Sequence, residues 1–141
     1  MAATLTPNLM TDDVNLSAAF YGDVLGFQFL CGVPFDSETP VDKLTTDVRL
    51  QWAMMELDGA KVMFQARTSL AREYPPMQEA EVGASATLYL EVEALDPLLQ
   101  RLDAGVETVL PDHVTFYGMR EAWILDNNGY LLALAEKAKP C

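Results

Sequence analysis

Few side chains in this sequence have the type and spacing that acid–base or nucleophilic chemistry requires. The single histidine, His113, follows Asp112 in a stretch that we expect to be a loop, where a lone histidine is usually a surface residue. Glu91 and Glu121 are candidates for general bases only if the fold places them within a hydrogen bond of a substrate proton. The sequence contains no nucleophile–base pair that we would defend, so we assign no catalytic residue.

The two cysteines do not indicate a metal site. Cys31 and Cys141 match neither a CxxC motif nor the spacing of a cysteine–histidine site. We expect free thiols, because disulfides are rare in reducing compartments. Cys31 lies at the end of a predicted strand, where a cysteine usually packs as a small hydrophobe.

The composition indicates one acidic domain. The chain has 141 residues, half of them hydrophobic, and a formal net charge of −12 at pH 7. A field of that sign repels phosphate backbones and anionic lipids, so we expect neither nucleic acid nor a membrane as a partner. No apolar run reaches the ~20 residues of a membrane span, and the first residues lack a secretory signal. We therefore expect a cytoplasmic protein. Its field would attract a cationic small molecule, and the alternative is that the acidity only keeps the protein in solution.

The pattern of apolar residues and turns predicts two similar halves. In the second half, Thr87–Val92 alternates as a half-buried strand does. A helix follows, with Asp96 as its N-cap, Pro97 at its first position and Gly105 as its end. Its leucines recur at i, i+3, i+4 and i+7 and are Leu95, Leu98, Leu99 and Leu102.

The first half repeats the order of strand, acidic cap, helix, glycine and strand. Leu5–Met10 is the predicted strand, and Asp12 and Asp13 form the cap. The predicted helix ends at Gly26, and the residues assigned to its buried face are Leu16, Phe20 and Val24. A strand resumes over residues 27–31.

Each half closes with a predicted hairpin. The turns are Asp58-Gly59 in the first half and residues 126–129, Asp-Asn-Asn-Gly, in the second. Residues 68–84 are predicted as a linker between modules at about 3–67 and 85–137. Residues 34–47 and 110–118 are predicted as long loops.

Alternation divides each predicted strand into an apolar set and a mixed set, because successive side chains point to opposite faces. The apolar set fits the face that the helices cover and includes Leu9, Phe64, Leu90 and Leu134. The mixed set combines amides, methionines and a tyrosine, which suits the lining of a cavity. A simply solvated face is the alternative.

Aromatic residues gather on the predicted central strands or on the loops beside them. Aromatic walls bind planar or cationic ligands, with about 0.5–2 kcal/mol for each contact. Packing in the core is the alternative for each residue, as it is for the methionines. The residues are Trp52, Tyr89, Phe116, Tyr117 and Trp123.

Two segments carry a resemblance to a known family. DVNLSAAFYGDVLGF at 13–27 and FYGMREAWILDNNGYLLALAE at 116–136, in their two-fold arrangement, resemble the glyoxalase/bleomycin-resistance/extradiol-dioxygenase (vicinal oxygen chelate) superfamily. The likeness spans nearly the whole chain, and it is specific for the superfamily rather than for one activity. It implies an α+β fold of two tandem βαβββ modules that form a curled, mainly antiparallel sheet around a pocket.

Metal-using members of this superfamily chelate a divalent ion with four His, Gln or Glu residues on the central strands. Counting from the helix caps and hairpin glycines assigns these four positions to Thr6, Met63, Thr87 and Ala133. Hydroxyls, a thioether and a methyl group are not the usual ligands of such ions. A shift of register by two brings in only the amides Asn8 and Gln65. We therefore predict no metal and no cofactor.

The resemblance leaves two functions open, beside the third possibility of a housekeeping domain with a vestigial pocket. The first is a metal-independent binding protein, similar to antibiotic-sequestering members, that holds an aromatic or cationic organic compound; we expect a homodimer whose subunits together shape each pocket. The alternative is a lyase, isomerase or dioxygenase relative with metal ligands or loop-borne catalytic residues that the register assignment missed. The predicted ligand-binding residues are Thr6, Asn8, Trp52, Met63, Gln65, Thr87, Tyr89, Phe116, Tyr117, Trp123 and Ala133.

Overall fold

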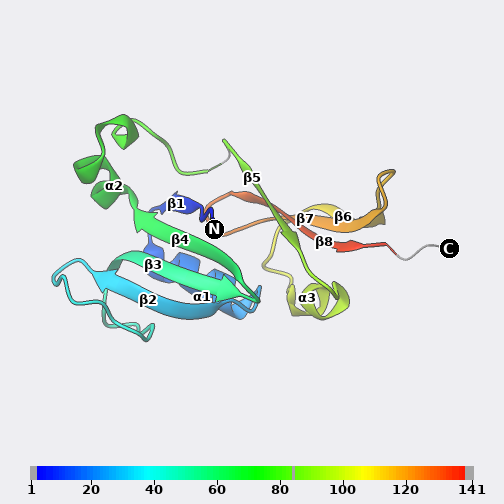
Figure 1. Cartoon of the computed structure of the whole chain (residues 1–141), viewed down its shortest axis with the longest axis horizontal. Helices are drawn as coiled ribbons and strands as arrows, with labels where there is room; N and C mark the ends of the chain where they lie inside the picture. The colour runs from blue at the N-terminus through cyan, green and yellow to red at the C-terminus, as the bar shows by residue number, and fades with distance from the viewer. Residues whose placement is uncertain (1–2, 84, 139–141) are drawn as a thin grey trace. The chain divides into compact units, whose positions relative to one another are not determined.

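The chain forms two compact units. The computed structural model describes residues 3–83 and 85–138, and the boundary between the units follows Val82 (Figure 1). Each unit contains a strand, a helix and three further strands in chain order. The predicted α+β fold of two βαβββ modules is therefore confirmed.

The first unit contains a four-stranded mixed sheet in the order β1-β4-β3-β2. β1 runs parallel to β4, and the other neighbours are antiparallel. The helix α1 (Val14–Asp23) lies against β3 and β4. The four strands are β1 (Asn8–Thr11), β2 (Gln28–Pro34), β3 (Leu50–Leu57) and β4 (Ala60–Ala66).

The start of α1 is confirmed, but its predicted buried face is wrong. Asp13 is the N-cap, and its carboxylate accepts a 3.1 Å hydrogen bond from the Leu16 N–H. Leu16 itself is exposed. The small side chain of Ala18 faces the sheet instead, and Tyr21 packs edge-on against Phe64. The buried residues of α1 are Val14, Ser17, Ala18 and Tyr21.

The second unit repeats the topology of the first, in the order β5-β8-β7-β6. β5 runs parallel to β8, the other pairs are antiparallel, and neither sheet closes on itself. One face buries Leu98, Ile124, Leu132 and Leu134. The elements are β5 (Thr87–Glu91), α3 (Asp96–Arg101), β6 (Thr108–Val114), β7 (Met119–Leu125) and β8 (Leu131–Lys137).

Both predicted hairpin turns are confirmed. Asp58 and Gly59 have φ angles of 48° and 91°, as a tight two-residue hairpin turn requires, and they connect β3 to β4. Gly129, with φ of 84°, closes the turn between β7 and β8. These turns set the register of both hairpins.

Several predicted boundaries are wrong. β1 begins at Asn8 rather than Leu5, so Leu5 and Thr6 precede the strand. Residues 110–114, predicted as a loop, belong to β6; this edge strand has no apolar alternation because all seven of its side chains are exposed. Leu95, not Asp96, is the N-cap residue of α3, because the Asp96 carboxylate binds Arg120.

The segment predicted as a linker is partly helical. It contains most of α2 (Arg67–Glu73) and the 3₁₀ turn η1 (Pro75–Met77). Leu70 and Ser69 are buried, so α2 packs onto the first unit. Cys31 is a half-buried free thiol in β2, and Cys141 lies outside the described residues.

Candidate ligand-binding site

The second sheet has an apolar face in the core, and its opposite face carries a buried carboxylate, Glu121, surrounded by aromatic side chains. Register places Tyr89, Ala133 and Trp123 in one row across β5, β8 and β7. The next row places Glu91, Ala135 and Glu121 on the same three strands. This face combines the buried carboxylate of Glu121 with aromatic neighbours.

Glu121 lies at the centre of this arrangement. Its Oε2 accepts hydrogen bonds from the hydroxyls of Tyr89 (2.5 Å) and Tyr117 (2.7 Å). Its Oε1 accepts a 3.0 Å bond from the indole Nε1–H of Trp123. Only 1% of Glu121 is exposed, so these three donors replace water around the carboxylate. We call this group of four residues the carboxylate–aromatic cluster.

Two alanines on β8 make the cluster geometrically feasible. Tyr89 and Glu121 belong to β5 and β7, which are separated by β8. Ala133 and Ala135 lie between them in register and are completely buried. Because a methyl group rises little above the sheet, the tyrosine can reach over β8 to the carboxylate.

The hydrogen bonds keep Glu121 ionised and the tyrosines neutral. Burial favours protonation of Glu121, but the bonds from Tyr89, Tyr117 and Trp123 outweigh it and hold its pKa below the ordinary value. Burial and the bond to Glu121 raise the pKa of Tyr89 strongly. The bond to Glu121, followed by burial, raises the pKa of Tyr117. The cluster therefore carries one negative charge that its neutral donors share.

Aromatic rings extend the cluster to the surface. Tyr89 packs edge-on to Trp123, with ring centroids 6.4 Å apart, and Phe116 packs edge-on to Tyr117 at 5.0 Å. Tyr89 is 47% exposed, Tyr117 53% and Phe116 100%. The rings thus present open surface to a ligand while both hydroxyls converge on one oxygen atom.

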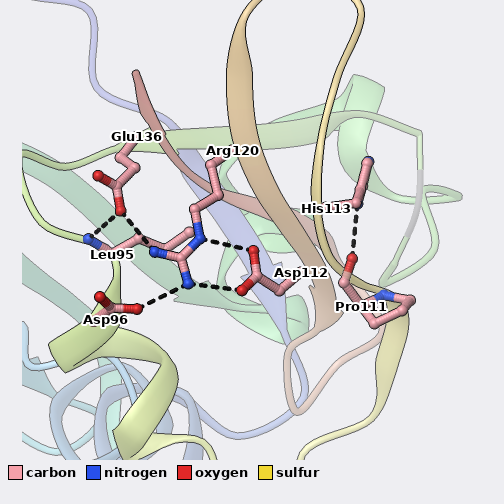
Figure 2. A network of polar contacts seen from close by, with 7 residues as sticks. All are labelled: Leu95, Asp96, Pro111, Asp112, His113, Arg120 and Glu136. Carbon is pink, nitrogen blue, oxygen red and sulfur yellow. Dashed lines mark hydrogen bonds and ion pairs between the residues drawn. The ribbon is translucent and has the colours of Figure 1, made fainter. Parts of the chain in front are cut away.

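The opposite side of β7 carries a compensated positive charge. The Arg120 guanidinium donates hydrogen bonds to Asp112 on β6, Glu136 on β8 and Asp96 of α3, at 2.7–3.1 Å (Figure 2). Glu136 also accepts the Leu95 N–H, so these contacts join α3 to three strands. Hydrogen bonding to Arg120 lowers the pKa of Asp112. We call this group the Arg120 clamp.

The remaining titratable groups offer little for catalysis. His113 pairs with Glu121 in the β6–β7 register, and its Nδ1 lies 2.7 Å from the Pro111 carbonyl oxygen (Figure 2). Glu91 is exposed and, with Val92, Glu93 and Lys137, lines a shallow hollow. Glu121 is a weak base, because three donors already stabilise its anionic form. The arrangement suits binding better than proton transfer.

The first unit brings its predicted residues into a neutral amide network. The Asn8 Nδ2 donates a 3.0 Å bond to Gln65 Oε1, and the Gln65 Nε2 donates one of 2.8 Å to the Ser69 hydroxyl. Trp52 pairs with Gln65 in register, and Met63 pairs with Asn8. Gln65 is buried, whereas Trp52 and Met63 are half-buried.

The predicted metal positions do not form a chelating set. Thr6 precedes β1, Met63 offers a thioether, Thr87 opens β5 as an exposed residue, and Ala133 is buried without any donor. Within residues 3–83 and 85–138, no group of three or more His, Cys, Asp or Glu side chains is placed to hold a metal ion. Hydroxyls, a thioether and a methyl group do not suit a divalent ion.

The sequence reasoning placed Tyr89, Tyr117 and Trp123 in a ligand site and missed the residue that joins them. Glu121 appeared only as an isolated candidate base. The signal was present in the second hairpin, since counting back from its turn pairs Trp123 with Ala133 and Glu121 with Ala135. The same count places the small side chains of Ala133 and Ala135 beneath the cluster, where they leave room for it.

Comparisons with known proteins agree with this architecture. A family profile described as bleomycin resistance protein-like N-terminal matches residues 4–41. No curated protein matches the chain. In the described part of the chain, no helix has the length and hydrophobicity needed to span a bilayer.

Solved structures match over nearly the whole length. A superfamily member from Sphaerobacter thermophilus superposes with a TM-score of 0.72 at 18% identity, covering 97% of this chain and 98% of its own. A glyoxalase/bleomycin resistance protein/dioxygenase family enzyme from Burkholderia phytofirmans gives 0.70 at 18%, covering 94% and 96%. TioX from Micromonospora sp. gives 0.65 at 18%, covering 96% and 99%. The chain therefore has the two-module fold of the glyoxalase/bleomycin resistance protein/dioxygenase superfamily.

Proposed function

We propose that this chain is a metal-independent binding protein for a small aromatic or cationic organic molecule. The observation that carries the proposal is the carboxylate–aromatic cluster of the second unit. It combines a buried, ionised Glu121 with the exposed rings of Tyr89 and Tyr117, and Phe116 lies beside them. Stoichiometric sequestration of an antibiotic-like compound needs such a surface and no catalytic group.

The exposed rings supply the attraction for a ligand. An aromatic or cation–π contact contributes about 0.5–2 kcal/mol, and more where water is excluded. Phe116 is fully exposed, so a planar compound could cover it without displacing core side chains. The net charge of −12 favours a cationic ligand over an anionic one of the same shape.

The proposal extends to the assembly of the chain and to its biological role. We propose a homodimer, in which a second copy completes the pocket, and a role in resistance to a toxic compound. The match of residues 4–41 to a bleomycin resistance protein-like N-terminal profile supports the resistance role by analogy. Light scattering of the purified chain tests the dimer, with a mass near 31 kDa expected from two chains of 15.6 kDa.

Fluorescence titration tests the binding function. Thioflavin T, a planar aromatic cation, is titrated into the Trp52→Phe variant, whose one remaining indole is Trp123. We expect saturable quenching, weakened about 3- to 30-fold by Phe116→Ala or Tyr117→Ala. Phe35→Ala and Tyr74→Ala, which remove similarly exposed rings from the first unit, are matched controls and should leave the affinity unchanged.

Two outcomes would contradict the proposal. One is the absence of saturable binding for thioflavin T and for a panel of aromatic and cationic compounds. The other is stoichiometric metal in the purified protein by elemental analysis, with binding of the compounds dependent on that metal. The second result would favour the enzymatic alternative.

A further inference from the structure

The acceptor positions of Glu121 are nearly filled by protein donors. A carboxylate offers about four lone-pair positions, and Tyr89, Tyr117 and Trp123 occupy three of them. The residue is 1% exposed, so a ligand on the surface touches the rings rather than the carboxylate. A ligand N–H group therefore gains no direct bond to Glu121.

The charge of Glu121 has no ion-pair partner. None of the ion pairs formed by described residues includes it, and the Arg120 clamp uses its guanidinium on three other carboxylates. Glu91, exposed in the same row of the sheet, adds a second negative charge at this face. His113, opposite Glu121 on β6, is the titratable group with a basic nitrogen in that row.

The tyrosines carry this charge to the surface. A phenol that donates to a carboxylate is polarised toward phenolate, which makes the face of its ring more negative. Cations bind over such faces within about 6 Å of the ring centroid. Tyr89 and Tyr117 are about half exposed although the hydroxyl of each is bound to Glu121.

We infer that the carboxylate–aromatic cluster selects a fully substituted organic cation, such as a quaternary ammonium group, over both neutral molecules and primary amines. The inference rests on the proposed binding function of the same face and adds the class of ligand. A quaternary cation is weakly hydrated and has no N–H groups to satisfy. A primary ammonium over the rings would lose strong hydration without reaching the enclosed Glu121 carboxylate.

Choline and its neutral isostere 3,3-dimethylbutan-1-ol provide the test. Each is titrated while the indole N–H signal of Trp123 is followed by NMR. We expect choline to bind at least 10-fold more tightly than the isostere, and tetramethylammonium more tightly than methylammonium. In Glu121→Gln the preference for choline should fall to about 2-fold or less, whereas affinity for the neutral isostere should change by less than 2-fold.

Two further variants separate the tyrosine effect from general electrostatics. Glu91→Gln removes an exposed charge from the same row and should reduce the preference by about 2-fold at most. Tyr89→Phe combined with Tyr117→Phe retains both rings, removes their bonds to Glu121 and should abolish most of the preference. This double variant also replaces Glu121→Gln if the latter loses its native circular dichroism spectrum.

The possible failures are distinguishable. Equal affinity of the wild type for choline and its isostere, or tighter binding of methylammonium than of tetramethylammonium, overturns the inference but leaves the binding function intact. A loss of preference in Glu91→Gln as large as in Glu121→Gln also overturns it. Failure of thioflavin T as well as all four small probes would overturn the binding function itself.

Discussion

The two sheets share one topology but differ in the strand that lies second in each. In the first unit, β4 places Met63 and Gln65 on the face opposite α1; in the second, the equivalent positions of β8 are Ala133 and Ala135. The long side chains of β4 fill their face and bond locally to Asn8 and Ser69. The alanines leave room for residues of non-adjacent strands to meet, so side-chain volume on one strand determines which site each module can form.

A larger side chain on β8 beneath the carboxylate–aromatic cluster should remove this difference between the sheets, and we expect it to have the largest effect. Ala133→Met places the first unit's residue at a completely buried position beneath the cluster. We expect a loss of about 1–3 kcal/mol in the free energy of unfolding, from overpacking and the broken Tyr89–Glu121 bond. Urea denaturation measures the loss, and Met63→Ala, at a half-buried position, should cost less. Equal losses in the two variants would show that the small side chain at position 133 is not required for the stability of the cluster.

Removing the amide of Gln65 should weaken the first unit without affecting the second. Gln65→Leu eliminates the bonds to Asn8 and Ser69, and we expect a loss of about 1 kcal/mol in the free energy of unfolding. Exposed Gln28→Leu on β2 is the control and should change stability by less than about 0.5 kcal/mol. Weaker thioflavin T binding by Gln65→Leu would argue that the first sheet belongs to the site.

Loss of the Arg120 clamp should loosen β6 rather than unfold the unit. Arg120→Gln leaves Asp112, Asp96 and Glu136 without their shared cation. We expect faster amide hydrogen exchange over residues 108–114, and weaker binding because Tyr117 lies between β6 and β7. Arg49→Gln, which breaks a single ion pair with Asp13, is the matched control. Unchanged exchange in β6 would mean that its backbone bonds to β7 suffice.

The smallest effect is spectroscopic and depends on pH. The pKa values of Tyr89 and Tyr117 are raised, so their stabilising bonds persist below the ordinary tyrosine pKa of about 10 and are lost as pH rises above it. The Glu121 pKa is lowered, so its contribution persists above the ordinary carboxyl pKa and is lost in stronger acid. Tyrosinate absorbance should show two late-titrating tyrosines in the wild type, shifted toward pH 10 in Glu121→Gln. Superimposable titrations would contradict the cluster.

Local patterns in the sequence were sufficient for most of the fold. Turn chemistry at Asp58 and Gly59 fixed one hairpin, and the Asp13 cap located α1, because these signals act over a few residues. β6 was missed because Pro111, Asp112 and His113 show no alternation, and an edge strand with both faces exposed needs none. The buried face of α1 was missed because a small alanine, rather than the larger leucine, faces the sheet.

The site was predictable only in part. The sequence predicted Tyr89, Tyr117 and Trp123 as aromatic lining, since their strands or neighbouring loops were recognisable. Their convergence on Glu121 depends on register across three strands and on the size of Ala133 and Ala135. Neither property appears in the spacing of residues along a single strand.

The irregular pairing of β6 with β7 has a consequence for how this module tolerates changes in chain length. Both register shifts place their extra residue on β6, between Thr108 and Leu110 and between Leu110 and His113. β7 pairs with β8 without a break from Met119 to Leu125. A one-residue insertion in β7 would exchange Arg120 and Glu121 between the two faces and reverse the charge presented to a ligand. Insertions in β6 are absorbed as bulges at the margin of the sheet, so the outer strand can diverge in length while the polarity of the site is preserved.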